Sequence, residues 1–193
     1  MDKINQVKQL VSEINRLHRQ FSQDYFETGK IDKLNLSRTI KQVPAHHIYR
    51  YRLTLHESIN DYLMVADIDI KYFYRVKTRE SIDDKMARFA SREDQYPVNN
   101  WMNDIFGARI LLEAKDISQV LDLMDSWQDE FGLKNWYLRD KPGYRGWHVY
   151  FKNKSNFYFP WELQIWDEVD VRSNIASHEK FKRSFIDDIT PQV

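Results

Sequence analysis

Four cations and a hydroxyl follow a short aromatic segment, and these are the first residues whose chemistry can be named. They are Arg75, Lys77, Ser81, Lys85 and Arg88. The spacing places them at the end of a strand and in the first turns of the next helix, so their donors can converge on one point. Because the N-terminus of a helix is electropositive, such a cluster suits a polyphosphate.

Two carboxylates belong to other predicted strands. Asp104 precedes a strand that carries Arg109, and Glu162 alternates with Gln164 in an otherwise apolar strand. A period of two puts Glu162 and Gln164 on one face. A carboxylate on a buried face is costly unless a cation or a metal answers it. Two carboxylates facing a phosphate-binding cluster predict Mg²⁺, which proteins usually hold with one or two carboxylates and substrate phosphates.

A tight basic turn completes the set of polar motifs. It reads Lys-Pro-Gly-Tyr-Arg-Gly-Trp-His over residues 141–148 and displays the ring of Tyr144. Taken alone, such a ring is more often a packing residue, and single cations are more often solvated. Their combination in one order along the chain is what points to a site.

The elements that must position these residues follow from periodicity. Strands are predicted at residues 70–76, 106–112, 133–139, 146–152 and 157–165. Helices are predicted from Ile4 to about Gly29, over 116–131 and over 168–185. Ser81 and Asp84 resemble a capping box that would begin a helix after the first strand. Residues 46–66 fit a strand and a helix equally well.

This order of elements predicts an α/β (α+β) fold, a mixed and mainly five-stranded sheet flanked by helices. A chain of 193 residues has the length of a single domain. Its parts would be a helical N-terminal part (1–66), a catalytic sheet (70–165) and a C-terminal helix (168–185).

Composition excludes several classes of protein. The chain has no Cys, so it has no disulfide framework, thiolate metal site or cysteine nucleophile. Its 29 basic and 29 acidic residues give no net charge, so any anion site must be local. No apolar run is long enough for a membrane span or a secretory signal, so a soluble, cytoplasmic chain without a membrane partner is expected.

In order and spacing the motifs resemble the (p)ppGpp synthetase domain of the RelA/SpoT proteins, a group that includes small alarmone synthetases and related toxins that modify tRNA. The shared patterns are Arg-x-Lys-x3-Ser-x3-Lys-x2-Arg from Arg75, Asp-x2-Gly-x-Arg from Asp104, Gly-Tyr-Arg-x2-His from Gly143 and Glu-x-Gln from Glu162. The similarity covers just under half of the chain. It implies a nucleotidyltransferase-like synthetase fold.

The resemblance also implies an activity, the transfer of the β,γ-pyrophosphate of ATP to a ribose 3′-hydroxyl with release of AMP. Arg75 and Arg109 would sandwich the adenine, and the phosphates would be held by Lys77, Ser81, Lys85 and Arg88. Asp104 and Glu162 would bind Mg²⁺, and Glu162 would also activate the acceptor hydroxyl. The acceptor would be bound by Tyr144, stacking on its base, and by Lys141, Arg145, His148 and Gln164. Such a transfer mostly needs positioning and charge stabilisation, which cations and Mg²⁺ supply.

Three departures from the family pattern bear on the acceptor. The Lys-Pro-Gly-Tyr turn is one residue shorter than the usual Lys-Pro-Asn-Gly-Tyr. Trp166 and Asp167 stand where Arg-Thr commonly follows, and only a short segment follows Gln164, where housekeeping small synthetases carry two helices used for tetramer assembly. The last two features resemble the toxin branch, whose acceptor is the 3′ end of tRNA and which an antitoxin protein restrains.

Charge distribution leaves the same choice of acceptor open. Residues 33–56 are basic and contain no acid, which is typical of a solvated face but would also suit an RNA-facing surface. The acceptor is therefore either a guanosine nucleotide (GDP or GTP) or a tRNA 3′ end. A catalytically inactive nucleotide or RNA sensor is a third reading, and the presence of both Asp104 and Glu162 argues against it.

Overall fold

The structure is a computed structural model, and the residues it describes are 2–28, 31–62, 69–92 and 95–187. At its centre is one five-stranded sheet. The strands are β1 (Lys71–Val76), β2 (Phe106–Leu112), β3 (Leu133–Lys141), β4 (Tyr144–Phe151) and β5 (Trp161–Asp167). They lie in the order β1-β2-β5-β4-β3; β2 and β5 are parallel, and the other neighbours are antiparallel. The predicted mixed sheet flanked by helices is confirmed.

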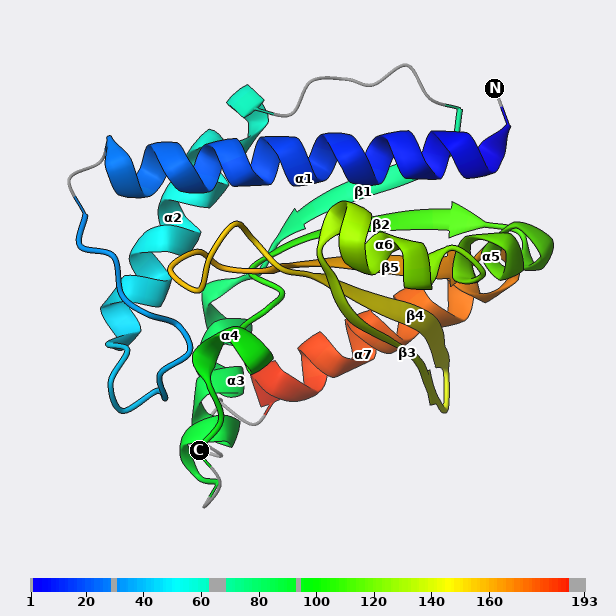
Figure 1. The fold of residues 1–193 in the computed structure, drawn as a ribbon. Helices are drawn as coiled ribbons and strands as arrows, with labels where there is room; N and C mark the ends of the chain where they lie inside the picture. Colours follow the sequence, from blue (N-terminus) through cyan, green and yellow to red (C-terminus); the bar gives the residue numbers. More distant parts are fainter. Residues whose placement is uncertain (1, 29–30, 63–68, 93–94, 188–193) are drawn as a thin grey trace.

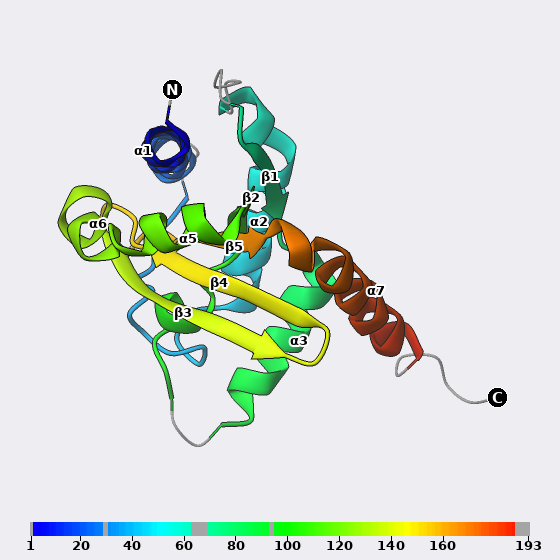
Figure 2. The same ribbon diagram turned by 90° about the vertical axis from the view of Figure 1, so that its right-hand side faces the viewer.

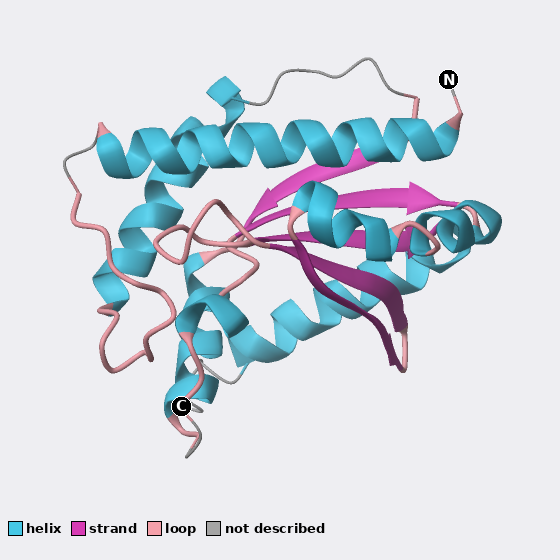
Figure 3. Cartoon of the chain, in the orientation of Figure 1, coloured by secondary structure: helices cyan, strands magenta, loops and turns pink. Residues whose placement is uncertain are grey.

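Helices cover both faces of this sheet (Figures 1 and 3). One face is covered by α1 (Lys3–Glu27), α5 (Ala114–Leu121) and α6 (Met124–Phe131), and the other by α3 (Arg79–Ala90) and α7 (Val171–Asp187) (Figure 2). Of the two remaining helices, α2 (Ala45–Tyr62) packs against α1, and α4 (Val98–Trp101) is a single turn. Among the helices in the described part of the chain, none has the length and apolar character that a membrane span needs.

The main core lies between α1 and the sheet. Val7, Leu10 and Ile14 recur at helical spacing, are fully buried, and share one cluster with Phe106 and Trp161 of the strands. The apolar stripe of α1 therefore takes one face of the sheet. The opposite face is left to carry polar side chains.

Two helix boundaries differ from those predicted. The helix expected to begin at a Ser81 and Asp84 capping box begins earlier, because Thr78 is its N-cap and accepts a hydrogen bond of 3.3 Å from the backbone N–H of Ser81. The helix expected over 116–131 is divided into α5 and α6. Leu123, with φ −92° and ψ −8°, lies at the break between them.

The C-terminal part also differs in detail. The last strand begins at Trp161 rather than at residue 157, since a turn precedes it and Pro160 has no N–H for the ladder. The final helix is preceded by a 3₁₀ turn, Glu168–Asp170, where Asp167 accepts from the N–H of Val169 at 3.1 Å.

The segment that sequence left undecided is helical as far as it is described. Ile48, Tyr51, Leu55 and Ile59 recur every three or four residues and are all buried, which is the helical pattern of α2. This pattern prevails over the strand-like alternation in the same stretch. Residues 63–66 lie outside the described residues.

Candidate active site

Strand register collects the predicted polar residues on the sheet face turned away from α1. One cross-strand row runs through Arg75, Gly107, Glu162 and Tyr150. The next row on the same face runs through all five strands as Phe73, Arg109, Gln164, His148 and Tyr137. Because residues two apart on a strand share a face, these two rows lie side by side.

Asp104 lies just before β2, where two lysines neutralise it. Lys77, at the end of β1, is 2.7 Å from Oδ2, and Lys85, on α3, is 2.9 Å from Oδ1. Burial alone would raise the pKa of Asp104, but the charges of Lys85 and Lys77 outweigh it and lower that pKa to about 2. Asp104 is therefore a buried anion that brings together Lys77, after β1, and Lys85, on α3. These are two of the cations that the sequence predicts at a phosphate-binding site.

Glu162 is the most heavily bonded carboxylate of the site. Its Oε2 accepts from Arg75 at 2.7 Å and from Gln164 Nε2 at 2.9 Å. Its Oε1 accepts from His148 Nδ1 at 2.7 Å and from the Tyr150 hydroxyl at 2.9 Å. Burial alone would raise the pKa of Glu162, but the His148 hydrogen bond and the Arg75 charge hold it well below its usual range. The side chain stays ionised although it is almost fully buried.

Arg75 links the two carboxylates. Its NH2 group is 2.7 Å from Glu162 and 3.7 Å from Asp104. Gly107 makes room for this link, because a Cβ there would lie 3.2 Å from Arg75 Nε and 3.3 Å from the Glu162 carbonyl oxygen. The Asp-x2-Gly-x-Arg motif thus uses its glycine to let the arginine of the neighbouring strand pass.

Arg109 has its edge and one face occupied. Gln164 Oε1 accepts from Arg109 Nε at 3.1 Å and from NH2 at 2.8 Å. The Trp166 ring lies under the guanidinium, with 3.5 Å from Cζ to the ring centroid. Burial, with a smaller effect of the Arg75 charge, lowers the pKa of Arg109 to about 10, so it remains a cation at neutral pH.

Tyr144, the predicted stacking platform, is packed in this structure. It is 9% exposed, and its hydroxyl lies 2.8 Å from His148 Nε2. The Trp166 and His178 rings meet it edge-on at 5.9 and 5.4 Å between centroids. Tyr144 therefore belongs to the site through its hydroxyl, while α7 covers its ring.

Four predicted residues lie at the edge of this cluster. Ser81 is in the first turn of α3, where Thr78 bonds to it, and Arg88 pairs with Asp84 at 2.7 Å on the surface of the same helix. Lys141 ends β3 and is exposed, and Arg145 pairs with Asp140 at 3.3 Å. Within the described residues, no hydrogen bond or ion pair joins any of the four to Asp104 or Glu162.

Several residues of the site escaped sequence reasoning. Tyr137, Tyr150, Trp166 and Asn174 have no motif that marks them. The alternation of β4 placed Tyr150 on the same face as His148, and that was the one signal available for it. Asn174 is on α7, and its amide accepts from Arg145 N–H and donates to Arg145 C=O, both at 2.8 Å. Only the tertiary fold brings α7 to the start of β4.

The donor set fits Mg²⁺. The described residues contain no group of three or more His, Asp or Glu placed to hold a metal. Asp104 and Glu162 are nevertheless both within reach of one Arg75 guanidinium, and Mg²⁺ in phosphate-transfer sites needs only one or two carboxylates besides the substrate. Arg75, Lys77 and Lys85 lie beside these carboxylate oxygens, at positions where a divalent cation would also be stabilised.

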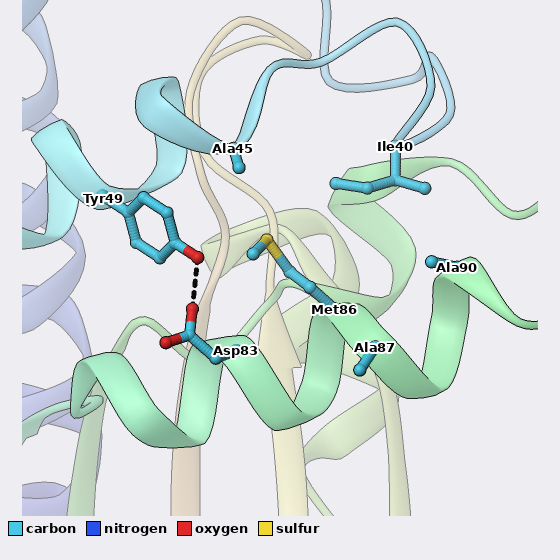
Figure 4. A pocket seen from close by; sticks show the side chains of 7 residues that line it. All are labelled: Ile40, Ala45, Tyr49, Asp83, Met86, Ala87 and Ala90. Atoms are coloured by element: carbon cyan, nitrogen blue, oxygen red, sulfur yellow. Dashed lines mark hydrogen bonds between the residues drawn. The ribbon is translucent and has the colours of Figure 1, made fainter.

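A groove of about 380 Å³ lies between α2 and α3 but is separate from these carboxylates. It is lined by Ile40, Ala45, Tyr49, Asp83, Met86, Ala87 and Ala90, and the Tyr49 hydroxyl donates to Asp83 across it (Figure 4). On α3, helical spacing puts the lining residues on the face opposite Ser81, Lys85 and Arg88. These lining residues are Asp83, Met86, Ala87 and Ala90.

The basic stretch 33–56 lies near the phosphate side of the site. Arg52 Nε donates to the carbonyl of Lys77 at 3.0 Å, and Lys33 pairs with Glu27 at 3.3 Å. In Figure 1 the stretch occupies the end of the molecule away from the β3–β4 turn that carries Tyr144. Arg38, Lys41 and Arg50 are exposed, and within the described residues none of them forms an ion pair.

Three solved structures show how far the likeness to other proteins extends. Small alarmone synthetase 1 of Bacillus subtilis, bound to its product pppGpp, is 22% identical, with 72% of this chain and 77% of that one covered and a TM-score of 0.46. A GTP pyrophosphokinase family protein of Streptococcus pneumoniae is 21% identical, with 76% of each chain covered and a TM-score of 0.47. Small alarmone synthetase 2 of B. subtilis is 20% identical, with 76% of this chain and 78% of that one covered and a TM-score of 0.41. At these values the likeness is too distant to assign an activity.

The comparison with protein families is more decisive. No curated protein matches the chain significantly. The family model described as a region found in RelA / SpoT proteins matches residues 74–184, and this match includes all four motifs and the residues around both carboxylates. Since the match spans more than half of its length, the chain belongs to the RelA/SpoT family, and its synthetase-type domain is a pyrophosphokinase.

Proposed function

We propose that this pyrophosphokinase uses ATP and Mg²⁺ to place a pyrophosphate on the ribose 3′-hydroxyl of GDP or GTP. The observation that carries the proposal is the joined pair of buried carboxylates, Asp104 and Glu162, with the cations of β1 and α3 around them. Buried carboxylates must be neutralised by neighbouring cations when no substrate is bound. The carboxylates suit a metal ion, and the cations around them suit a polyphosphate.

The residues divide into a donor half and an acceptor half. Lys77 and Lys85 release Asp104 and bind the ATP phosphates, together with Ser81 and Arg88 from the same helix. Arg75 and Arg109 present their guanidinium faces to the adenine. The acceptor half is formed by His148 and Gln164 next to Glu162, and by the Tyr144 turn with Lys141 and Arg145. Burial lowers the pKa of Lys77, and the charge of Asp104 opposes that effect.

The transfer needs one bond to form and one to break. The ribose 3′-oxygen bonds to the β-phosphorus of ATP, the bond from that phosphorus to the oxygen bridging to the α-phosphorus breaks, and AMP leaves with that oxygen. The proton of the 3′-hydroxyl goes to solvent. The lysines and arginines stabilise the charge that builds up on the phosphate oxygens.

Asp104 and Glu162 would hold Mg²⁺, which supplies charge neutralisation at the β- and γ-phosphates when bound. The pKa of Glu162 is held well below its usual range, so this carboxylate has little tendency to accept the proton of the hydroxyl. It suits a metal ligand that also orients the hydroxyl. Arg75 would leave Oε2 to the metal and keep a guanidinium face for the adenine. That movement opens one side of the carboxylate.

Transfer of label from ATP tests this function directly. The protein is incubated with Mg²⁺ and γ-labelled ATP, with GDP, GTP or deacylated tRNA as acceptor, and the products are separated. Label on the guanosine nucleotide with one AMP released per transfer is the expected result. Label on tRNA alone would assign the toxin activity, and tight ATP binding without AMP release would assign an inactive sensor.

The tRNA acceptor has one observation in its favour, the exposed cations Arg38, Lys41 and Arg50, which form no ion pair with the described part of the chain. Against it, the stretch 33–56 lies away from the β3–β4 turn (Figure 1), and Arg52 and Lys33 already have partners within the chain. A guanosine nucleotide carries its own phosphates and needs no distant basic surface. An antitoxin partner belongs only to the tRNA alternative.

A further inference from the structure

We propose that Trp166 is a positioning residue that fixes the ATP-binding Arg109 and the acceptor-side Tyr144 at the same time. The proposal rests on the proposed function for the roles of these two partners. Trp166 is on β5, two residues beyond Gln164 and on the same sheet face. It is 1% exposed yet stands outside the hydrophobic core that α1 builds on the other face. The Trp166 ring is therefore buried among the side chains of the polar face and not in the core.

The indole fixes Arg109 by covering one face of the guanidinium. Cζ is 3.5 Å above the ring centroid, while Gln164 takes the edge of the same group. A base can then stack only on the remaining face. The Arg109 side chain is already held in one orientation, so it loses less conformational freedom when a base stacks on it. The contact with Trp166 therefore raises the affinity for the base.

The indole N–H also belongs to a hydrogen-bond chain that ends at Glu162. Trp166 Nε1 donates to the Tyr144 hydroxyl at 3.3 Å, since an indole nitrogen can only donate. The Tyr144 hydroxyl in turn lies 2.8 Å from His148 Nε2. Because the ionised Glu162 can only accept, His148 Nδ1 carries the hydrogen of their 2.7 Å hydrogen bond. One ring thus orients both an acceptor residue and the catalytic carboxylate.

Two neighbours of Trp166 enclose the ring. A Cβ at Gly146 would lie 2.7 Å from indole Cδ1 and 2.9 Å from Nε1, so a side chain there would displace the ring. On α7 the His178 ring is stacked against the indole at 5.7 Å with an interplanar angle of 22°. The position is closed on both sides, as a fixed support requires.

Two substitutions separate the two contacts of the indole. Trp166→Phe keeps an aromatic face under Arg109 and removes the N–H, so the KM for ATP should stay within about twofold of wild type while the KM for the acceptor rises about 3- to 10-fold. Trp166→Leu removes both contacts, so the KM for ATP should also rise, by about 5- to 30-fold. Trp147→Leu is the matched control. This partly buried ring is on β4 but outside both rows, so its loss should lower stability and change neither KM.

The outcomes distinguish this proposal from the proposed function. A folded Trp166→Leu protein with both KM values unchanged overturns the positioning role, as do Trp166→Phe and Trp166→Leu proteins that lose both affinities equally. A wild-type protein that transfers no pyrophosphate shows instead that the proposed function is wrong. The Arg109 contact is then read from unfolding midpoints of Trp166→Leu, Arg109→Gln and the double variant, where non-additive shifts support the contact and additive shifts overturn it.

Discussion

Arg75 donates a 2.7 Å hydrogen bond to Glu162 and thereby occupies one oxygen of the carboxylate that is proposed to orient the acceptor. The same guanidinium is the one expected to stack on the adenine of ATP. Its NH2 group lies 2.7 Å from Glu162 and 3.7 Å from Asp104, so it would compete with the Mg²⁺ that these two carboxylates are proposed to hold together with ATP. If the site binds ATP and Mg²⁺ as proposed, their binding and the exposure of Glu162 would be coupled through this one side chain.

This coupling predicts an ordered binding of substrates. In wild type, GDP should bind at least about tenfold more tightly when Mg²⁺ and a non-hydrolysable ATP analogue are present, since the metal proposed at the carboxylates would displace Arg75 from Glu162. In Arg75→Gln the dependence should largely disappear. Titration calorimetry with GDP, in the presence and absence of the analogue, measures both. Equal GDP affinities in wild type under the two conditions would show that Arg75 does not control access.

Glu162→Gln tests the charge at the centre of the site. An amide has one acceptor oxygen where the carboxylate accepts four hydrogen bonds, and it binds Mg²⁺ poorly. Turnover should fall by about 10² to 10⁴ while the affinity for ATP changes little. Glu168→Gln, at an exposed acid just beyond β5, is the control and should keep wild-type turnover. A near wild-type rate for Glu162→Gln contradicts the role given to Glu162.

His18 predicts a pH dependence of stability that is independent of the active site. It is buried on α1, stacked on Phe106, with Nε2 2.9 Å from the Tyr51 hydroxyl. Burial, with a smaller effect of the Arg19 charge, lowers its pKa from 6.5 to about 3. Between these values the unfolded chain binds a proton that the folded protein excludes, so stability falls as the pH falls through this range.

The measurement is the free energy of unfolding in urea from pH 8 to pH 4. His18 contributes a loss of about 1.4 kcal/mol per pH unit below pH 6.5. His18→Gln retains a partner for Tyr51 but cannot be protonated, so its curve should be flatter by that amount. Above pH 7 the two proteins should show the same slope, which serves as the internal reference. Parallel curves down to pH 4 would refute the assignment.

The sheet and most residues of the candidate site could be predicted from the sequence because both depend on local patterns. Alternation along each strand and conspicuous polar residues at the strand ends mark Arg75, Asp104 and Glu162 without any tertiary information. The boundaries that failed depend on smaller effects. Thr78 competes with Ser81 as the N-cap, and Pro160 delays the last strand.

What sequence did not reveal is how the predicted residues bind one another. The link from Arg75 to Glu162 arises because β1 and β5 lie on either side of Gly107 in β2, and this strand order is a property of the whole sheet. Burial of Tyr144 under α7 and the position of Trp166 under Arg109 have the same origin. A period of two states which face a side chain takes, but it does not state which residue of another strand or helix it meets.

The exposed cations of the stretch 33–56 distinguish the two possible acceptors. If the acceptor is tRNA gripped by this surface, each phosphate contact adds about 0.7 to 0.9 to the slope of log affinity against log salt. Replacing Arg38, Lys41 and Arg50 together by Gln should then flatten the slope for tRNA by about 2 and leave ATP binding unchanged. Arg52 is kept in this variant, because its hydrogen bond to the Lys77 carbonyl supports the ATP site and its loss would confuse the two effects.

For a GDP acceptor the same triple replacement should change neither the salt slope nor the turnover, since a single nucleotide ends at its own phosphates and does not reach the end of the molecule away from the β3–β4 turn (Figure 1). The control is Lys8→Gln, which removes one exposed cation from α1 that pairs with Glu130 at 2.9 Å. Filter binding of tRNA between about 50 and 300 mM salt supplies the slopes, because counterion release is linear in this range. A flattened slope in the triple variant alone would favour tRNA, and it would contradict the guanosine acceptor if transfer to tRNA fell with it.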